Sequence, residues 1–366
     1  MSLDWWSGKR VFLTGHTGFK GGWCSLWLRA LGAELTGYAL GPDSPRSFFE
    51  LAQVAQGMNS IIGDILDLER LTDAMRGSEP QIVLHLAAQS LVRAGYERPV
   101  ETYATNVVGT ANVLDAARRA AGVRAVVVVT SDKCYRLDDP DARHVESDPL
   151  GGRDPYSGSK AGAEFVAAGL RDAFFERARP RIGLATARAG NVVGGGDWAR
   201  DRLVPDLITA FETHEPAQVR NPDAIRPWQH VLDPLAGYVA LARRLCEDAS
   251  CARAWNFGPP ADHEQTVAWV ADRVAAAWGP EARWESSRAQ ERGTASGRDA
   301  SGRDYIEAGA LRLDSSVARE RLGWSARVAL PAALEWTVQW HKRLRAGESA
   351  RALSLEQIER YQALAA

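Results

Sequence analysis

The chain has 366 residues, a formal net charge of −2, 45% hydrophobic residues and 25% charged residues. This composition is that of a globular protein with enough chain to bury one large core or two joined cores, and its near-zero charge gives no electrostatic basis for binding nucleic acid or an anionic membrane. The first ten residues are too polar for a signal peptide, and no window approaches the roughly 20 apolar residues of a membrane span.

Apolar runs of strand length alternate with helical patterns through the first half of the chain. The predicted strands are residues 10–14, 34–40, 60–64, 82–86, 125–130 and 182–189, and the predicted helices are 23–31, 100–121 and 161–176. Strands that alternate with helices predict an α/β fold with a doubly wound parallel sheet, covered by helices on both faces.

This alternation ends near residue 191. Residues 194–198 (GGGDW) predict a loop, 203–213 a short helix, 226–231 a strand or loop edge, and 266–278, 330–345 and 354–364 helices; 285–305 is rich in Arg, Gly, Ser and Asp and predicts an exposed or mobile loop. We therefore expect a dinucleotide-binding domain over 1–190, with 230–257 added, and a smaller mixed α/β lobe over 191–229 and 258–366.

A glycine-rich turn, TGHTGFKG, follows the first predicted strand. Glycines allow a tight turn and allow a pyrophosphate to approach a helix N-terminus, where free N–H groups and the helix dipole favour anions. A helix N-cap with incidental glycines is the alternative, but the position after the first strand of an alternating pattern favours a dinucleotide. The predicted cofactor contacts in this turn are Gly15, Thr17, Gly18, Phe19, Lys20 and Gly21.

The residues that would bind the adenosine are less certain. The second predicted strand ends without an acidic residue, and Asp43 and Arg46 follow in the loop, so this signal leaves NAD and NADP open. Asp64 closes the next strand, where it could accept a hydrogen bond from the adenine amino group or cap a helix.

Tyr156 and Lys160 are four residues apart at the start of a predicted helix and therefore lie on one face of it. A phenol that acts as a base near neutral pH needs a lowered pKa, which a neighbouring ammonium and the positive nicotinamide ring would provide. Ser131 leaves the preceding strand and supplies a hydroxyl that could share the substrate proton. The exits of parallel strands are where open α/β sheets build their sites.

Taken together, the glycine turn, LHLAAQ at 84–89, Asn106, Ser131 and the Tyr156/Lys160 pair resemble the extended short-chain dehydrogenase/reductase family of nucleotide-sugar enzymes. The motifs GHTGFKGGW, TSDKCY, DPYSGSK, RAGNVVGGGDW, RPWQHV and LDSSVAR are similar, more narrowly, to its CDP-glucose 4,6-dehydratases. The resemblance runs from about Ser7 to about Lys342. It implies a Rossmann-type fold, tightly held NAD and conversion of CDP-glucose to CDP-4-keto-6-deoxyglucose. The further cofactor contacts that it implies are Ile65, Leu86, Ala87, Ala88, Asn106 and Thr130.

The resemblance also implies roles for the catalytic residues. Tyr156 would take the C4 hydroxyl proton while hydride passes to NAD, with Lys160 and Ser131 assisting; water would then leave across C5 and C6, and hydride would return to C6. Asp132 is the predicted acid and Lys133 the predicted base. The alternative is that Lys133 only pairs with Asp132. The related dTDP-glucose dehydratases carry Asp-Glu here, while inverting UDP-N-acetylglucosamine 4,6-dehydratases also carry Asp-Lys.

Substrate contacts are predicted from position, because arginine is abundant in this chain. Arg226 is the first candidate for the pyrophosphate and Arg202 the second, since a guanidinium binds two phosphate oxygens. By family analogy, Asn191 and His230 would contact the phosphates or the base, and Gln89 and Arg93 would face the hexose or be structural. Trp198 and Trp228 could stack on the base, although burial is commoner for tryptophan.

Three other readouts complete the expectations. Only five of the 44 basic residues are lysines (Lys9, Lys20, Lys133, Lys160 and Lys342), which weakly favours tasks that need a removable proton. The four cysteines have no metal-type spacing, so we expect no metal site, and free thiols in the cytoplasm. Helices 100–121 and 161–176 are apolar enough to form the face of a homodimer or homotetramer. A long 288–305 loop, and Ile306 where the family has His, depart from the pattern and leave another nucleotide sugar, a 4-epimerase and a non-catalytic dinucleotide sensor as alternatives.

Overall fold

The computed structural model describes residues 3–139, 142–286 and 310–364. Seven parallel strands form the central sheet in the order β11-β6-β5-β4-β1-β2-β3. They are β1 (Arg10–Thr14), β2 (Glu34–Ala39), β3 (Asn59–Ile62), β4 (Ile82–His85), β5 (Ala125–Val129), β6 (Gly183–Ala189) and β11 (Ala254–Phe257). The predicted doubly wound α/β fold is confirmed. The six predicted strands agree within two residues at each end, whereas no strand was predicted at β11.

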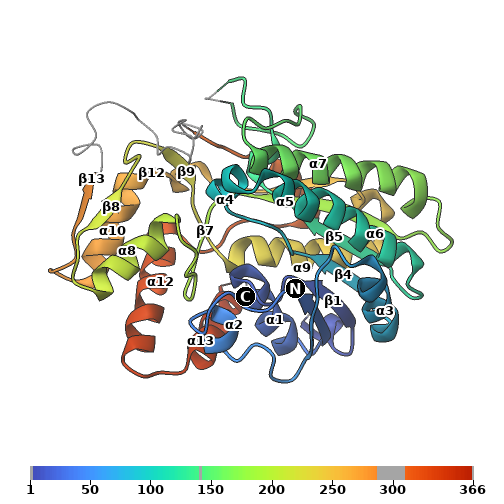
Figure 1. The fold of residues 1–366 in the computed structure, drawn as a ribbon, viewed down its shortest axis with the longest axis horizontal. Helices are drawn as coiled ribbons and strands as arrows, with labels where there is room; N and C mark the ends of the chain where they lie inside the picture. The colour runs from blue at the N-terminus through green and yellow to red at the C-terminus, as the bar shows by residue number, and fades with distance from the viewer. Residues whose placement is uncertain (1–2, 140–141, 287–309, 365–366) are drawn as a thin grey trace.

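Alternating side chains of the strands feed two separate layers of core. Phe12 of β1 and Val126 of β5 pack in the layer under α3 (Leu68–Ser78), α6 (Gly109–Arg119) and α7 (Pro155–Leu170). Leu13 and Val127 point to the opposite face, which α1 (Phe19–Ala30) and α9 (Leu232–Glu247) cover. Figure 1 shows α6 and α7 on one side of β4 and β5, with α1 on the other. A sheet covered in this way exposes its carboxyl-terminal edge for a site.

The helix predicted over 100–121 is not continuous. It consists of α5 (Pro99–Tyr103), a π-helical turn at Ala104–Val108, and α6. The wider turn directs Asn106 into the interior, where 2% of its surface is exposed. The helix predicted at 161–176 begins earlier, as α7, and also ends in a π turn, Arg171–Phe175. Wide turns of this kind have no signature in the apolar pattern and occur often at functional sites.

The smaller lobe is built from short strand pairs and three helices, α8, α10 and α12, which gather at the left of Figure 1. β7 (Val192–Val193) pairs with β10 (Gln229–His230), β8 (Ala217–Val219) with β13 (Trp284–Ser286), and β9 (Ile225–Pro227) with β12 (Glu264–Thr266). The helices are α8 (Leu203–Glu212), α10 (Val267–Trp278) and α12 (Leu330–Arg345). Glu285 and Ser286, predicted as loop, therefore belong to a strand, and residues 287–309 lie outside the described residues.

The remaining elements are short or peripheral. They are the helices α2 (Phe48–Leu51), α4 (Val92–Glu97), α11 (Ser316–Leu322) and α13 (Ala350–Ala363), and the 3-10 turns Leu3–Trp6, Asp132–Cys134, Ala249–Cys251 and Ala261–His263. None of the helices in the described residues combines the length and apolarity needed to cross a bilayer.

The last helix returns to the dinucleotide side of the molecule. The ring of Tyr361 in α13 lies 5.4 Å from that of Trp27 in α1. The indole N–H of Trp23, also in α1, donates to the carbonyl oxygen of Gly195 at 3.0 Å. One hydrophobic cluster runs through α1, α9, α10 and α12 without a break. The predicted domain boundaries remain predictions, because this core does not divide where the sequence pattern does.

Candidate active site

A cavity of about 1310 Å³ opens at the carboxyl-terminal edge of the sheet, between the strand exits and the smaller lobe. The turn after β1 and the segment after β4 form one part of its wall, the segment after β5 and the start of α7 a second, and the lobe residues after β6 a third. The cavity is thus where a parallel sheet is expected to place a ligand.

The glycine turn has a shape that other residues could not adopt. Gly15 has a φ of +80°, and a Cβ there would lie 2.7 Å from the backbone nitrogen of Ala87. A Cβ on Gly21 would lie 2.0 Å from the carbonyl oxygen of Gly15. Gly18 caps α1 without a side-chain hydrogen bond, so the first-turn amides have no side-chain acceptor. These glycines are not incidental, and the turn offers the close backbone approach and free donors that a dinucleotide pyrophosphate requires.

Most of the predicted cofactor contacts line this cavity, and Asp64 has both of the properties considered for it. Its Oδ1 accepts a 2.9 Å hydrogen bond from the backbone nitrogen of Leu66, and Asp67 provides the N-cap of α3. Asp64 therefore stabilises the turn before the helix while it also forms cavity wall. The cofactor candidates that line the cavity are Gly15, Thr17, Gly18, Phe19, Lys20, Gly21, Asp64, Ile65, Leu86, Ala87, Ala88, Thr130, Tyr156 and Lys160.

Asn106 and Gln89 are not among the residues that line the cavity. The Asn106 amide accepts from the backbone nitrogen of Gln89 at 2.9 Å and donates to the carbonyl oxygen of Gln89 and to Ser159 Oγ at 2.9 and 2.8 Å. The Gln89 side chain donates to Thr102 Oγ1 and to the carbonyl oxygen of Leu91. Both side chains are occupied in bracing the segment after β4 against α7, which is a positional task rather than the predicted ligand contact.

His230 also lies away from the cavity. Its side chain is completely buried between the rings of Trp23 and Trp336, whose centroids lie 6.2 and 5.4 Å from its own. Burial lowers its pKa to about 3, and its Nδ1 accepts a hydrogen bond from the backbone nitrogen of Leu232. The structure thus gives the predicted substrate ligand the role of a neutral core residue, because the lobe packs over it.

The segment after β5, residues 130–135, is hereafter the catalytic segment. Ser131 Oγ donates to Asp132 Oδ1 at 2.9 Å. The other carboxylate oxygen, Oδ2, is buried at the cavity without a hydrogen-bond partner among the described residues. Lys133 lines the cavity, and no ion pair joins it to Asp132 in the described part of the chain. A role for Lys133 that consists only of holding Asp132 therefore has no contact behind it. Cys134 and Tyr135 are fully buried.

Tyr156 and Lys160 project from the first two turns of α7, which Asp154 caps by accepting from the backbone nitrogen of Ser157. Lys160 Nζ donates to the carbonyl oxygen of Val129 at 3.4 Å, and burial lowers its pKa to about 8, against the opposing effects of Cys134 and Glu164. The sequence predicted a lowered pKa for Tyr156, but burial raises it to about 12, and a hydrogen bond with Ser131 only partly offsets this.

Three of the five lysines line the one cavity. The third is Lys20, on the first turn of α1. Burial lowers its pKa to about 8; Arg202 and Lys160 lower it further, while Asp132 and Asp197 act in the opposite direction. A lysine that burial and other cations keep near neutrality in charge differs from the solvated charge that most surface lysines carry.

The arginines predicted to bind substrate are already paired with acids. Arg202 Nη1 donates to Asp197 at 2.9 Å, and Arg93 lies 2.9 Å from Asp201, which also pairs with Arg220 at 3.0 Å. Arg93, Arg202, Arg226 and Asn191 line the cavity, as do Asp197, Asp201, Arg220 and Asn221. The last four were not predicted, because nothing in their sequence context distinguishes them from ordinary loop residues.

Two tryptophans occupy the wall in different ways. Trp228 is 4% exposed and its indole N–H donates to the carbonyl oxygen of Gln265, so burial dominates. Trp198 instead receives the Arg46 guanidinium 3.7 Å from its ring centroid, and Arg46 also pairs with Glu212. This contact joins the loop after β2 to the smaller lobe. Among the described residues, no group of His, Cys, Asp or Glu side chains is arranged to hold a metal ion.

Comparison with known proteins agrees with this geometry. The family described as GDP-mannose 4,6 dehydratase matches residues 12–337. A CDP-glucose 4,6-dehydratase of Salmonella typhimurium is 45% identical over 362 residues, covering 98% of this chain and 97% of that protein.

Two solved structures share the fold at lower identity. A UDP-glucose 4-epimerase from Brucella ovis in complex with NAD is 21% identical, with a TM-score of 0.74 over 91% of this chain and 98% of that one. A dTDP-glucose 4,6-dehydratase from Bacillus anthracis in complex with NAD is 18% identical, with a TM-score of 0.73 over 92% and 97%. The chain belongs to the GDP-mannose 4,6 dehydratase family of nucleotide-sugar enzymes.

Proposed function

We propose that the chain is an NAD-dependent hydro-lyase that converts CDP-D-glucose to CDP-4-dehydro-6-deoxy-D-glucose. The observation that carries this proposal is the meeting of Ser131, Asp132, Lys133, Tyr156 and Lys160 at one cavity that the glycine turn also lines. The similarity to a CDP-glucose 4,6-dehydratase over nearly the whole of both chains supports the choice of nucleotide and sugar.

The cavity fits NAD because the turn from Gly15 to Gly21 leaves room for a backbone-bound pyrophosphate and no room for a Cβ at either end. In this proposal the turn holds the pyrophosphate, and Asp64 and Ile65 border the adenine. Leu86, Ala87, Ala88 and Thr130 form the wall between the two halves of the cofactor. When bound, NAD supplies a hydride acceptor and donor, which a dehydration without net redox change regenerates within each turnover.

Tyr156 is the residue that takes the C4 hydroxyl proton in this proposal. Its phenol has a pKa of about 12 through burial, so it needs a nearby positive charge to work as a base near neutral pH. Lys160, one turn along the same face of α7, provides an ammonium at that position. Ser131, which is hydrogen-bonded with the phenol, shares the proton and orients the hydroxyl.

Asp132 and Lys133 carry the elimination. Lys133, in its neutral amine form, removes the proton at C5, which a ketone at C4 makes acidic. Asp132, in its protonated form, gives a proton to the C6 hydroxyl, which leaves as water. The buried and unpartnered Oδ2 of Asp132 is the oxygen from which that proton would come. A 4-epimerase needs no such acid and base beside the serine, so this pair favours a dehydratase.

The substrate diphosphate would lie against the lobe side of the cavity. Arg226 and Arg202 are the proposed phosphate ligands, with Asn191 beside them and Arg93 toward the hexose. Because Arg202 and Arg93 already pair with carboxylates, their guanidiniums are held in place before substrate arrives. Preorganised cations lose less side-chain entropy on binding.

The proposal includes a homodimer in the cytoplasm. Large apolar side chains are exposed on α5, α7 and the π turns beside them: Val100 (80%), Phe165 (62%), Val108 (52%), Phe174 (45%) and Tyr103 (44%). Burial of such a face against a second copy is the economical explanation for that much exposed apolar surface. The four cysteines are free, which is consistent with a reducing compartment.

The test is incubation of the purified protein with CDP-, dTDP-, GDP- and UDP-glucose, with no added electron acceptor, followed by mass spectrometry of the sugar nucleotides. Loss of one water from CDP-glucose in preference to the others supports the proposal. Loss of water from another nucleotide sugar would replace the substrate and keep the reaction. A product of unchanged mass but inverted C4 configuration would indicate an epimerase, and no change with any of the four would favour a dinucleotide sensor.

A further inference from the structure

A buried ion pair lies directly behind the catalytic segment. Arg188 of β6 and Glu164 of α7 are 3% and 4% exposed, and Arg188 Nη2 donates to Glu164 Oε2 at 2.8 Å. Burying two charges costs more desolvation than the pair usually recovers, so such a pair is weak evidence for stability alone. Its retention behind a reaction centre calls for a functional explanation.

Glu164 holds the near end of the catalytic segment. It lies one turn after Lys160 on α7, and its Oε1 accepts a hydrogen bond from Thr130 Oγ1 at 2.5 Å. Its Oε2 also accepts from Thr186 Oγ1 at 2.7 Å. Thr130 is the residue before Ser131. One carboxylate therefore links the helix that carries Tyr156 and Lys160 to the strand exit that carries the acid and the base.

Arg188 holds the far end of the same segment. Its Nη1 donates to the hydroxyl of Tyr135 at 2.8 Å and to the carbonyl oxygen of Glu146 at 3.1 Å. Tyr135 follows Lys133 by two residues and is completely buried. The two ends of the catalytic segment, Thr130 and Tyr135, are thus each hydrogen-bonded to one member of a single ion pair.

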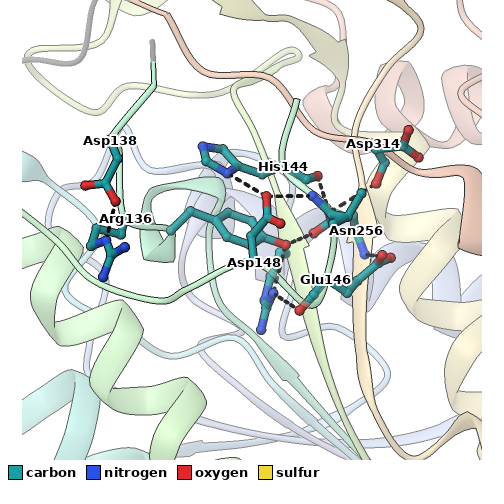
Figure 2. A network of polar contacts seen from close by, with 10 residues as sticks. Arg136, Asp138, His144, Glu146, Asp148, Asn256 and Asp314 are labelled. Atoms are coloured by element: carbon teal, nitrogen blue, oxygen red, sulfur yellow. Dashed lines mark hydrogen bonds and ion pairs between the residues drawn. The ribbon is translucent and has the colours of Figure 1, made fainter. Parts of the chain in front are cut away.

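The contacts continue from Tyr135 toward the smaller lobe. The Tyr135 hydroxyl donates to Asn256 Oδ1 at 2.7 Å, and Asn256 Nδ2 donates to the carbonyl oxygens of His144 and Asp314 at 2.9 and 3.0 Å. Glu146 Oε1 accepts from the backbone nitrogen of Asn256 at 2.9 Å. Figure 2 shows Asn256 among Glu146, His144 and Asp314, with each of these contacts drawn as a dashed line. The network connects the catalytic segment to β11 and to residues 310–315.

We propose that Glu164 and Arg188 are positioning residues of the reaction: they hold the two ends of residues 130–135 so that Ser131, Asp132 and Lys133 face the cavity, and Glu164 keeps the amine of Lys160 protonated. This inference rests on the proposed dehydratase function. Neither side chain lines the cavity, so both act through other residues.

The electrostatic part of this role follows from the surroundings of Lys160. The charged and titratable groups that act on it or respond to it are Lys20 on α1, His85 at the end of β4, Cys134 on the catalytic segment and Glu164 on its own helix. Burial keeps the pKa of His85 at about 3, so His85 is neutral near pH 7. Among the residues that the structure describes, Glu164 is the ionised carboxylate that acts against the lowering of the Lys160 pKa by burial.

The first experiment compares the pH dependence of kcat/KM for the wild-type enzyme and Glu164→Gln, which removes the charge but keeps the size. We expect the basic limb, assigned to Lys160, to move to lower pH by about 0.5 unit or more. Glu164→Asp retains the charge and should leave the limb near its wild-type position. Glu176→Gln, an exposed site paired with Arg181 just beyond the same helix, is the matched control and should change neither limb nor rate.

The second experiment loosens each end of the segment without changing charge. Thr130→Val and Tyr135→Phe remove the contacts to Glu164 and Arg188, respectively. We expect kcat to fall by about 10- to 100-fold with little change in KM, because a small misplacement of catalytic groups is enough for such a loss. An unmoved limb in Glu164→Gln, or wild-type kcat in both end variants, would overturn the inference. Since the wild-type enzyme is assayed alongside, inactivity of every protein including wild type would instead count against the proposed function.

Discussion

Lys160 Nζ and the carbonyl oxygen of Val129 lie 3.4 Å apart, so α7 delivers an ammonium to the last residue of β5, immediately before the catalytic segment. The contact brings a buried cation to the strand exit where a phenol, a carboxylate and a second amine also meet. It links the stability of the protein to its chemistry, because the group that activates Tyr156 is costly to bury.

Replacement of Lys160 by methionine should stabilise the fold near neutral pH. The folded-state pKa is lowered from 10.5 to about 8, so below pH 8 the protein contains a buried charge that is solvated when unfolded. Between pH 8 and 10.5 the unfolded state binds more protons, so the stability of the wild-type protein rises relative to the variant. We expect Lys160→Met to gain about 1–3 kcal/mol at pH 7 and to lose this advantage by pH 10.5.

Urea unfolding at several pH values measures that difference. Lys342→Met, which removes an exposed lysine outside the cavity, controls for the loss of a lysine in general. A Lys160→Met advantage that stays constant from pH 7 to pH 10.5 would contradict a buried cation as its cause.

Tyr156→Phe should remove most of the activity and leave the fold intact. The change deletes one hydroxyl whose neighbour is Ser131, and general acid–base catalysis contributes about 10²- to 10⁴-fold to a rate. We expect kcat for water loss from CDP-glucose to fall by that factor, with unchanged circular dichroism and melting temperature. If the variant turns over at the wild-type rate, another group takes the C4 proton.

Lys133→Met should separate oxidation from elimination. Without an amine at that position, the C5 proton is not removed, while Tyr156 and Lys160 remain in place for the first step. In deuterated water, we expect no solvent deuterium at C5, together with a retained cofactor absorbance change on adding substrate. Lys133→Arg keeps a cation but cannot act as a base, and should fail in the same way. Deuterium incorporation at the wild-type level in both variants would assign the base to a different residue.

The glycine turn supplies a prediction with a built-in control. A Cβ at position 21 meets the carbonyl oxygen of Gly15 at 2.0 Å, whereas the nearest atom to a Cβ at position 18 is 3.5 Å away. Gly21→Ala should lower the free energy of unfolding by about 1–3 kcal/mol through overpacking and weaken NAD binding. Gly18→Ala should change stability by less than about 1 kcal/mol. Chemical denaturation and NAD titration test both; equal effects at the two positions would argue against the steric explanation.

The exposed apolar face of α5 and α7 predicts the oligomeric state. Phe165→Glu and Val108→Glu place charges on side chains that are 62% and 52% exposed. We expect each variant to dissociate a dimer to monomers in analytical ultracentrifugation. Leu364→Glu, at a site that is also 52% exposed but lies at the end of α13, should leave the dimer unchanged. A wild-type protein that sediments as a monomer at micromolar concentration would refute the proposed assembly.

The local signals that succeeded are those in which one residue type is needed for a backbone reason. The apolar run at 125–129 is a strand because both faces of the sheet are covered, and every residue of it is buried. The glycines of the turn were informative because a side chain there would collide with backbone. The Tyr156/Lys160 spacing predicted a shared helix face, and Asp154 and Pro155 begin that helix at the expected place.

The failures have a common physical origin. The amide of Asn106 is used up by Gln89 and Ser159 only because a π turn directs it inward, and no apolar pattern encodes that turn. His230 is a core residue because α1 and α12 close around it from opposite ends of the chain. The expected lowering of the Tyr156 pKa is reversed because burial outweighs local hydrogen bonding. In each case the deciding partner is distant in sequence.

The sequence by itself determined the order of the strands and helices, the position of the dinucleotide turn, and the residue types that a dehydratase needs, because these depend on periodicity, on backbone sterics and on the chemistry of single side chains. Tertiary structure alone decided that Thr130 and Tyr135 are held by the two members of one ion pair, and which arginines are paired in advance. Burial, charge proximity and hydrogen-bond saturation are properties of packed neighbours, and these neighbours come together only when β5, β6 and α7 are assembled.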